Sequence, residues 1–246
     1  MTLTLNRPSA YNSFTRPMAT ALQQGLDAAS TDDSIRCVVI TGNGKAFCAG
    51  QDLKEVTADD APPLEDIVGG SYNVTIRKMR ALAKPVITAV NGVAAGAGAN
   101  IALAGDLCVA AEDAKFIQAF SKIGLIPDSG GTWMLPKLIG LQRATALAYL
   151  GTSVTAPEAA AMGMIHRSIP NAEFDVEVTA LAEKLAAMPT RGLALTKQAF
   201  NKGFEQSMDA QLETEMELQA AASRTCDFEE GVSAFLEKRK PTFKGH

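Results

Sequence analysis

Hydrophobic and polar positions follow two different patterns along the chain. In the first half, short apolar runs rich in β-branched residues, such as residues 37–41 and 85–90, lead into small-residue turns and then into segments with helical periodicity. From Gly130 onward helical signals dominate. Strand-and-helix units followed by a helical region predict an α/β protein with a C-terminal helical extension.

The same pattern gives the boundaries of the individual elements. In the first part we expect strands at residues 2–5, 37–41, 85–90, 107–111 and 115–117, and helices at residues 18–30, 68–83 and 98–104. Residues 59–66 contain two adjacent prolines and four carboxylates and predict an exposed loop. Further helices are expected at residues 135–150, 157–162, 177–188, 192–222 and 228–239. We place a boundary near Met188-Pro189, between a core of residues 1–188 and a helical region of residues 189–246.

Two turns rich in small residues carry the clearest chemical signal. They are FCAGQDL at residues 47–53 and NGVAAGAGAN at residues 91–100, and each follows a predicted strand. A strand, a tight turn and a helix start leave backbone N–H groups unpaired. Two such turns side by side would hold one oxygen atom between two N–H donors, as in an oxyanion hole. The alternative is that the small residues serve only close strand–helix packing.

Asp128 is the candidate ionisable group. It precedes a glycine pair and an apolar helix, so either Asp128 or Ser129 is a candidate N-cap. The alternative is a carboxylate that faces an apolar pocket lined by Phe120, Ile126 and Trp133. Burial there would raise the pKa of the carboxyl and make it a useful base.

Composition excludes several other classes of protein. The 246 residues are 47% hydrophobic and 20% charged with a net charge of −4, which argues against nucleic acid as a partner. No apolar run reaches the roughly 18–20 residues that span a bilayer, so we expect no membrane partner and a cytoplasmic location. The four cysteines are scattered without a C-x-x-C pair and predict buried, reduced thiols. Neither histidine has a further ligand at metal-binding spacing, so no metal is expected.

Three common catalytic motifs are incomplete in this chain. Gly96-Ala97-Gly98 lacks the third glycine of a dinucleotide fingerprint, because Ile101 stands in its place. The glycines near Lys45 lack the hydroxyl residue of a phosphate-binding loop. There is no G-x-S-x-G elbow, which disfavours hydrolysis by an activated serine.

Taken together, six segments resemble the crotonase superfamily, also called the enoyl-CoA hydratase/isomerase family. They are residues 3–8, 45–53, 84–92, 127–132, 159–165 and 230–241. The resemblance covers nearly the whole chain. It implies an α/β fold with a crotonase-like ββα spiral core and a C-terminal helical extension, an acyl-CoA thioester as substrate, and no separate cofactor. It also implies a homotrimer or a hexamer built as a dimer of trimers.

The resemblance assigns roles to individual residues. The thioester oxygen would accept hydrogen bonds from the backbone N–H groups of Gln51 and Ala97, and Asp128 would be the catalytic carboxylate. The implied contacts with the remainder of the acyl-CoA come from residues Lys45, Ala46, Ala49, Asp52, Leu53, Gly96, Phe120, Pro127 and Trp133.

The acid–base residues limit the reaction. The two glutamates that activate water in typical hydratases fall here on Asn100 and Phe120, neither of which exchanges a proton in the required way. With Asp128 as the one carboxylate, the resemblance implies an acyl-CoA isomerase that moves a proton near the thioester. Residues 116–133 are most similar to members that convert the ring epoxide of phenylacetyl-CoA to an oxepin in phenylacetate degradation. The alternatives are an enoyl-CoA hydratase, an isomerase of linear 3-enoyl-CoA in fatty acid oxidation, and a non-catalytic CoA-binding subunit.

Overall fold

The computed structural model describes all residues from 1 to 246. Its strands are β1 Thr2–Leu5, β2 Val38–Gly42, β3 Ala46–Cys48, β4 Val86–Val90, β5 Val93–Ala95, β6 Leu107–Ala111, β7 Lys115–Ile117, β8 Ser153–Thr155 and β9 Arg167–Ile169. Its α-helices are α1 Arg16–Thr31, α2 Leu53–Val56, α3 Leu64–Ile67, α4 Val74–Ala81, α5 Ala97–Leu103, α6 Gly131–Ile139, α7 Leu141–Leu150, α8 Ala156–Ala161, α9 Phe174–Ala186, α10 Thr190–Gly203, α11 Met208–Ala222 and α12 Cys226–Glu237. Short 3-10 turns occupy Pro8–Ala10, Ala119–Ile123 and Asn171–Glu173, and a π-helical segment occupies Val68–Asn73.

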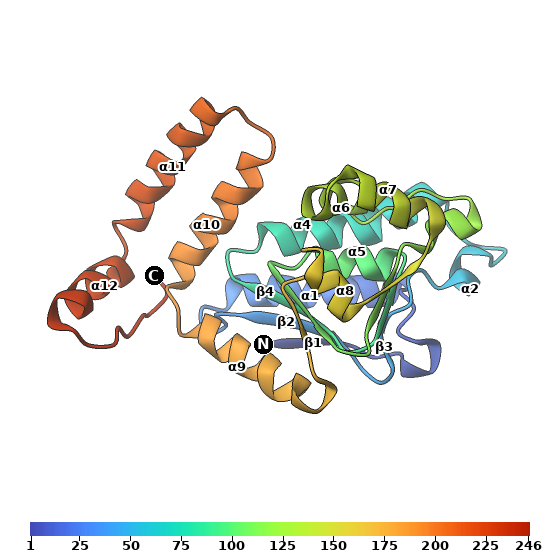
Figure 1. Ribbon diagram of the computed structural model, residues 1–246, viewed down its shortest axis with the longest axis horizontal. Coiled ribbons are helices and arrows are strands. Elements are labelled where there is room, and N and C mark those ends of the chain that lie inside the picture. The colour runs from blue at the N-terminus through green and yellow to red at the C-terminus, as the bar shows by residue number, and fades with distance from the viewer.

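The strands form two sheets, and both contribute to the hydrophobic core. A five-stranded parallel sheet has the order β1-β2-β4-β6-β9, and a four-stranded sheet has the order β3-β5-β7-β8 with only the β7–β8 pair antiparallel. From β2 to β7 the chain places alternate strands in the two sheets, and a helix leads into the next pair. This repeated strand–strand–helix path is the predicted ββα spiral. Helices α1 and α5 pack against its strands, and α4 packs on α1 (Figure 1).

Two glycines occupy the corners where the chain passes from one sheet to the other. A Cβ atom on Gly42 would lie 2.2 Å from the carbonyl oxygen of Ala46, and one on Gly92 would lie 2.2 Å from that of Lys45. Both contacts are with backbone, which has little freedom to move. The close approach explains why small residues stand at these corners, and it brings the ends of β2, β3 and β4 together.

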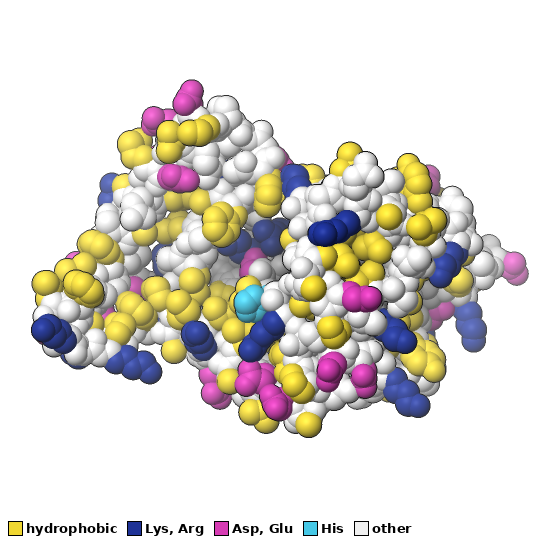
Figure 2. All heavy atoms as spheres, in the orientation of Figure 1, with side chains coloured by type: hydrophobic (Ala, Val, Ile, Leu, Met, Phe, Trp, Pro, Cys, Tyr) yellow, Lys and Arg dark blue, Asp and Glu magenta, His cyan; other side chains and the backbone are white.

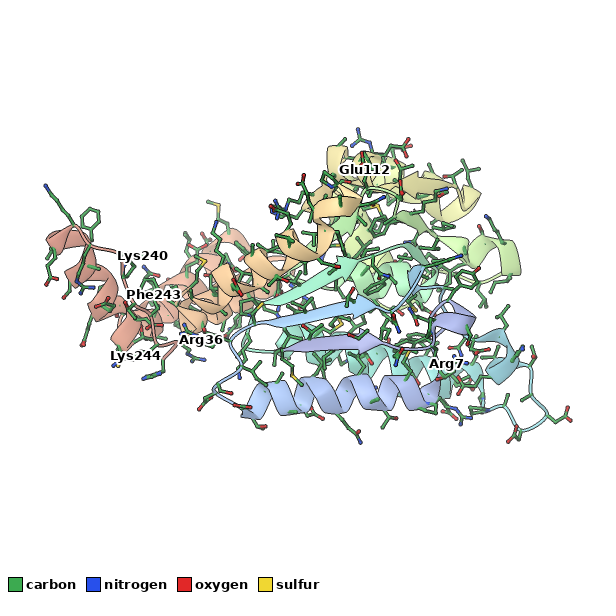
Figure 3. The ribbon with its side chains drawn as sticks, turned by 90° about the horizontal axis from the view of Figure 1, so that it is seen from below. Arg7, Arg36, Glu112, Lys240, Phe243 and Lys244 are labelled. Carbon is green, nitrogen blue, oxygen red and sulfur yellow. The ribbon has the colours of Figure 1, made fainter.

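Helices α10, α11 and α12 extend away from the two sheets as an arm (Figure 1). The base of the arm is tied to the core by Lys197 of α10, whose buried ammonium group donates to Asp106 Oδ2 at 2.9 Å and to the carbonyl of Met79 at 2.8 Å. Arg36 donates to the carbonyls of Met188 and Phe243, and Figure 3 shows it beside Phe243 at the base of the arm. The division into two domains at residue 188 stays a prediction, although the break between α9 and α10 lies there.

The boundaries of most predicted elements are confirmed to within about three residues. Three predicted helices are not the single continuous α-helices that we expected. The helix expected at 135–150 is two helices, because Gly140 takes φ 78° and ψ 156° and ends α6. The helix expected at 192–222 is an antiparallel pair, α10 and α11, joined by a turn at residues 204–207. The helix expected at 68–83 begins as the π-helical segment at Val68–Asn73.

Several other expectations have a direct counterpart in the structure. Residues 59–63 are irregular and largely exposed, as predicted, and α3 begins only at Leu64. Cys37, Cys48 and Cys108 are buried free thiols, whereas Cys226 is exposed. None of the helices combines the length and the apolar character needed to cross a membrane.

Candidate active site

The two small-residue turns lie directly against each other. Gly50, at φ 92°, packs so closely on the second turn that an added Cβ would lie 2.9 Å from the carbonyl oxygen of Ala95 and 3.7 Å from the amide nitrogen of Ala97. Gly98 packs as closely on the first turn, since its Cβ would lie 2.2 Å from the carbonyl oxygen of Cys48. The turns are therefore both close-packed and adjacent, so the packing explanation and the oxyanion-hole geometry hold at the same time.

The amides of Gln51 and Ala97 remain unpaired at this junction. Neither N–H group donates a hydrogen bond to any acceptor in the chain. On either side of Gln51, the carbonyl of Gly50 and the amide of Asp52 pair with the backbone of Phe14, at 2.7 and 3.0 Å. Ala97 is the first residue of α5, where the helix dipole adds partial positive charge. The arrangement offers two backbone donors to one oxygen atom.

Asp128 is held at the same end of α5. The side chain of Asn100, one turn into α5, donates through Nδ2 to the carbonyl oxygen of Asp128 at 2.8 Å. The carboxylate of Asp128 accepts a hydrogen bond from Ser129 Oγ at 2.8 Å. Burial raises the pKa of Asp128 above its ordinary value, and the Ser129 hydroxyl offsets part of that increase. A carboxylate with a raised pKa is a stronger base toward carbon acids than an exposed one.

The cap interpretation of this segment is wrong. Helix α6 begins at Gly131, its N-cap is Gly130 at φ 75°, and no side chain caps it. Ser129 itself takes φ 52°, in the left-handed region that non-glycine residues seldom adopt. Strained backbone beside a half-buried carboxylate is a common property of functional sites. The hydroxyl of Ser129 and the carboxylate of Asp128 therefore pair with each other instead of serving the helix.

Asn100 has a structural function in this arrangement. It is fully buried, and its Oδ1 accepts a hydrogen bond from Gln118 Nε2 at 2.8 Å while its Nδ2 holds Asp128. Gly131 packs directly on it, because an added Cβ would lie 2.1 Å from Asn100 Nδ2. The oxygen and the nitrogen of the Asn100 amide are therefore both committed to hydrogen bonds within the protein.

The other titratable groups near the two turns are unsuited to accept a proton from carbon at neutral pH. Burial raises the pKa of the Cys48 thiol to about 12, so the thiol stays protonated. Burial also raises the pKa of Tyr72, and the nearby negative charge of Asp128 raises it further. The carboxylate of Glu55 is occupied by Arg16 and by the side chain of Gln51. Asp128 is left as the basic group of the cluster.

The three apolar side chains expected around Asp128 have different surroundings. Phe120 is buried beside the second turn, with its ring tip 3.9 Å from where a Cβ on Gly96 would lie. Ile126 is instead 79% exposed. Trp133 packs edge-on against Phe204, just after the end of α10, and lines a separate cavity of about 480 Å³ between α6 and α10. That Ile126 and Trp133 line one pocket with Asp128 stays a prediction, since the structure exposes Ile126 and packs Trp133 against Phe204.

The segment expected to line the remainder of the acyl-CoA is only partly free. Lys45, Ala49 and Leu53 are exposed, whereas Ala46 is buried in β3. The side chain of Asp52 caps α2 and accepts a hydrogen bond from Arg7 at 2.8 Å, and Arg7 lowers the pKa of that carboxyl. Figure 3 places Arg7 at the end of the molecule away from the arm. Pro127, next to Asp128, is half-buried.

Tyr72 is a member of this cluster that the sequence patterns did not identify. Its hydroxyl donates to Gln51 Oε1 at 2.6 Å. The sequence pattern placed it inside an ordinary helix, and the only signal of something else was the Gly69-Gly70 pair just before it. No group of three or more histidine, cysteine, aspartate or glutamate side chains in the structure is arranged to hold a metal ion.

Comparison with known proteins agrees with this geometry. The family model described as enoyl-CoA hydratase/isomerase matches residues 1–246. A 1,2-epoxyphenylacetyl-CoA isomerase of Escherichia coli is 49% identical, covering 100% of this chain and 95% of the relative. A 2,3-dehydroadipyl-CoA hydratase of the same species is 38% identical, covering 99% and 94%. Among solved structures, an enoyl-CoA hydratase from Bacillus anthracis has a TM-score of 0.94 at 34% identity, covering 100% and 95%.

Proposed function

Because this chain belongs to the enoyl-CoA hydratase/isomerase family, a family that implies an acyl-CoA substrate, we propose that it is an acyl-CoA isomerase with Asp128 as its proton shuttle. The observation that carries the proposal is the combination of two unpaired amides, at Gln51 and Ala97, with the half-buried carboxylate of Asp128. The charge of that carboxylate acts on Tyr72, the hydrogen-bond partner of the Gln51 side chain. The positions that activate water in hydratases hold Asn100 and Phe120, which supports proton transfer over addition of water.

The proposed reaction begins at the carbon next to the thioester. The Asp128 carboxylate accepts a proton from that carbon, and the electron pair of the broken C–H bond moves into the thioester carbonyl. The resulting enolate oxygen accepts hydrogen bonds from the Gln51 and Ala97 amides. Asp128 then donates a proton to a carbon further along the conjugated acyl group, so the product is an isomer and the enzyme regains its starting state.

We further propose that the acyl group is the ring epoxide of phenylacetyl-CoA and that the product is the oxepin. The 49% identity to a 1,2-epoxyphenylacetyl-CoA isomerase over the full length supports this choice. So does the buried ring of Phe120 beside Gly96, which offers an aromatic surface near the thioester. An enoyl-CoA hydratase is the second candidate, favoured by the relative that is a 2,3-dehydroadipyl-CoA hydratase.

A substrate panel tests the proposal. The purified protein is assayed with the ring epoxide of phenylacetyl-CoA, with a linear 3-enoyl-CoA and with crotonyl-CoA. We expect the epoxide to give the highest kcat/KM, the 3-enoyl-CoA to isomerise more slowly, and crotonyl-CoA to take up no water. Fast hydration of crotonyl-CoA would replace the isomerase by the hydratase, and no turnover of any member would favour a non-catalytic CoA-binding subunit.

We also propose that the chain assembles as a homotrimer or a dimer of trimers through its C-terminal arm. Figure 2 shows hydrophobic side chains gathered on the surface of the arm. The exposed large apolar residues of α10–α12 and the turn after α10 are Phe200, Phe204, Met208, Leu212, Met216, Phe228, Val232, Phe235 and Leu236. Apolar surface of this extent marks an interaction site. Sedimentation velocity should give a mass of three or six times 25.9 kDa, and a single species of 25.9 kDa would contradict the assembly.

A further inference from the structure

Tyr72 occupies an unusual position in the backbone. It lies in the π-helical segment Val68–Asn73, and its side chain is only 1% exposed. Gln23 of α1 holds this segment, since its side chain donates to the carbonyls of Gly70 and Ser71 at 3.0 and 3.1 Å. A π-segment shifts which residues face inward, and such segments are frequent at functional sites. Here it turns Tyr72 toward the first small-residue turn.

The side chain of Tyr72 contacts that turn in two ways. Its hydroxyl donates to Gln51 Oε1 at 2.6 Å. Its ring stacks on Phe14, with 5.4 Å between ring centroids and 23° between planes. The backbone of Phe14 in turn pairs with the residues before and after Gln51. Tyr72 therefore contacts the Gln51 peptide both through the Gln51 side chain and through Phe14, whose backbone pairs with it.

The far end of the Gln51 side chain is also fixed. Gln51 Nε2 donates to Glu55 Oε2 at 3.1 Å, and Glu55 accepts from the backbone and side chain of Arg16. The primary amide of Gln51 is thus held between the neutral hydroxyl of Tyr72 and a carboxylate. The Gln51 N–H shares a planar peptide with the Gly50 carbonyl, which accepts from the Phe14 N–H at 2.7 Å. The direction of the Gln51 N–H therefore depends on where Phe14 is held, and the Tyr72 ring packs on Phe14.

We propose that Tyr72 is a positioning residue of the oxyanion hole: its hydroxyl and ring hold the Gln51 peptide so that the Gln51 N–H points at the thioester oxygen. This inference rests on the proposed function, because it takes Gln51 as one of the two donors. Tyr72 acts through Gln51, and no contact between Tyr72 and the substrate is required. Preorganised donors are effective because they need no reorientation as charge develops on the oxygen.

The test uses the substitution Tyr72→Phe, which removes the hydroxyl and keeps the ring that stacks on Phe14. Phenylacetyl-CoA labelled with ¹³C at the thioester carbonyl is bound to the full-length protein, and its carbonyl stretch is recorded by infrared difference spectroscopy. In the wild-type protein we expect the stretch to fall below its value in water, because two N–H groups polarise the bond. In Tyr72→Phe we expect a smaller decrease. Tyr149→Phe, on exposed α7, is the matched control and should leave the wild-type decrease unchanged.

Kinetics supply a second readout on the same variants. The interaction strengthens as the enolate forms, so Tyr72→Phe should lower kcat about 3- to 10-fold with little change in KM, the effect of one neutral hydrogen bond. Gln51→Leu removes the acceptor of the same hydrogen bond. If the bond is the cause, the double variant Tyr72→Phe/Gln51→Leu should lose no more activity than the more severe single variant.

The outcomes separate this inference from the proposed function. If the wild-type protein leaves the carbonyl stretch at its value in water, the oxyanion hole itself is absent and both fail. If the wild-type protein lowers the stretch and Tyr72→Phe lowers it equally with unchanged kcat, only the role of Tyr72 is overturned. A lower melting temperature of Tyr72→Phe with both readouts intact would also overturn it, since that pattern describes a residue needed only for folding.

Discussion

Gly98 offers a direct way to move the two proposed donors apart. Its Cβ position lies 2.2 Å from the carbonyl oxygen of Cys48 and 2.8 Å from the carbonyl carbon, and contacts shorter than 3.0 Å do not persist. In Gly98→Ala the start of α5 must therefore shift by about 0.8 Å away from β3, which carries Cys48 just ahead of Gln51. A misplacement of about 1 Å at a reacting group typically costs about 100-fold in rate. In a helix, alanine is more stable than glycine by about 1 kcal/mol, but the overpacking against Cys48 costs about 1–3 kcal/mol. The two effects together lower the stability of Gly98→Ala slightly.

We expect Gly98→Ala to fold, to unfold at a somewhat lower temperature, and to lose about 100-fold in kcat toward its acyl-CoA substrate. Circular dichroism reports the fold and the melting temperature, and a steady-state assay reports kcat and KM. Gly192→Ala in α10 is the matched control, because a Cβ at Gly192 meets only the side chain of Pro189, at 3.8 Å. If folded Gly98→Ala kept wild-type kcat, the junction of the two turns would not be the seat of catalysis.

Three other substitutions give predictions from burial and charge. Burial raises the pKa of Asp128 in the folded state above its value in the unfolded chain, so the unfolded chain ionises first as the pH rises and the folded state loses stability. Asp128→Asn should therefore have a higher melting temperature than wild type at pH 7. This difference in melting temperature should vanish below pH 4, where Asp128 is protonated in both states. Lys197→Met leaves its carboxylate partner half-buried without this cation and should lower the free energy of unfolding in urea by about 3 kcal/mol, whereas exposed Lys184→Met should change it by less than about 0.5 kcal/mol. Asn100→Glu should destabilise the protein without adding hydration of crotonyl-CoA, because Gly131 leaves no room for a longer side chain; a gain of hydration would contradict this geometry.

The sequence predicted four strands of the five-stranded sheet, because their β-branched runs are bounded by turns. It missed β9 and, in the second sheet, β3, β5 and β8, each of which has only three residues. The strands β6 and β7 were predicted at the residues where the structure has them. The break at Gly140 was missed because leucine and alanine on both sides have helical spacing, and only the φ of 78° reveals the interruption. The turn at residues 204–207 was missed for the same reason.

The candidate site was predictable where it depends on backbone, and less so where it depends on side chains. The two small-residue turns were identified because glycine is needed where Gly50 and Gly98 approach the neighbouring backbone. Tyr72 was missed because its approach to Gln51 depends on a π-turn, which leaves no periodic signature in the sequence. Trp133 was placed beside Asp128 from its nearness in sequence, whereas α6 turns it toward α10.

The exchange of hydrogen at the carbon next to the thioester decides whether Asp128 shuttles a proton there. Phenylacetyl-CoA is incubated with the protein in heavy water, and deuterium at that carbon is followed by mass spectrometry. We expect the wild-type protein to catalyse incorporation, and Asp128→Asn to bind the thioester with similar affinity but to incorporate deuterium no faster than the uncatalysed reaction. Incorporation by Asp128→Asn at the wild-type rate would contradict the proton shuttle.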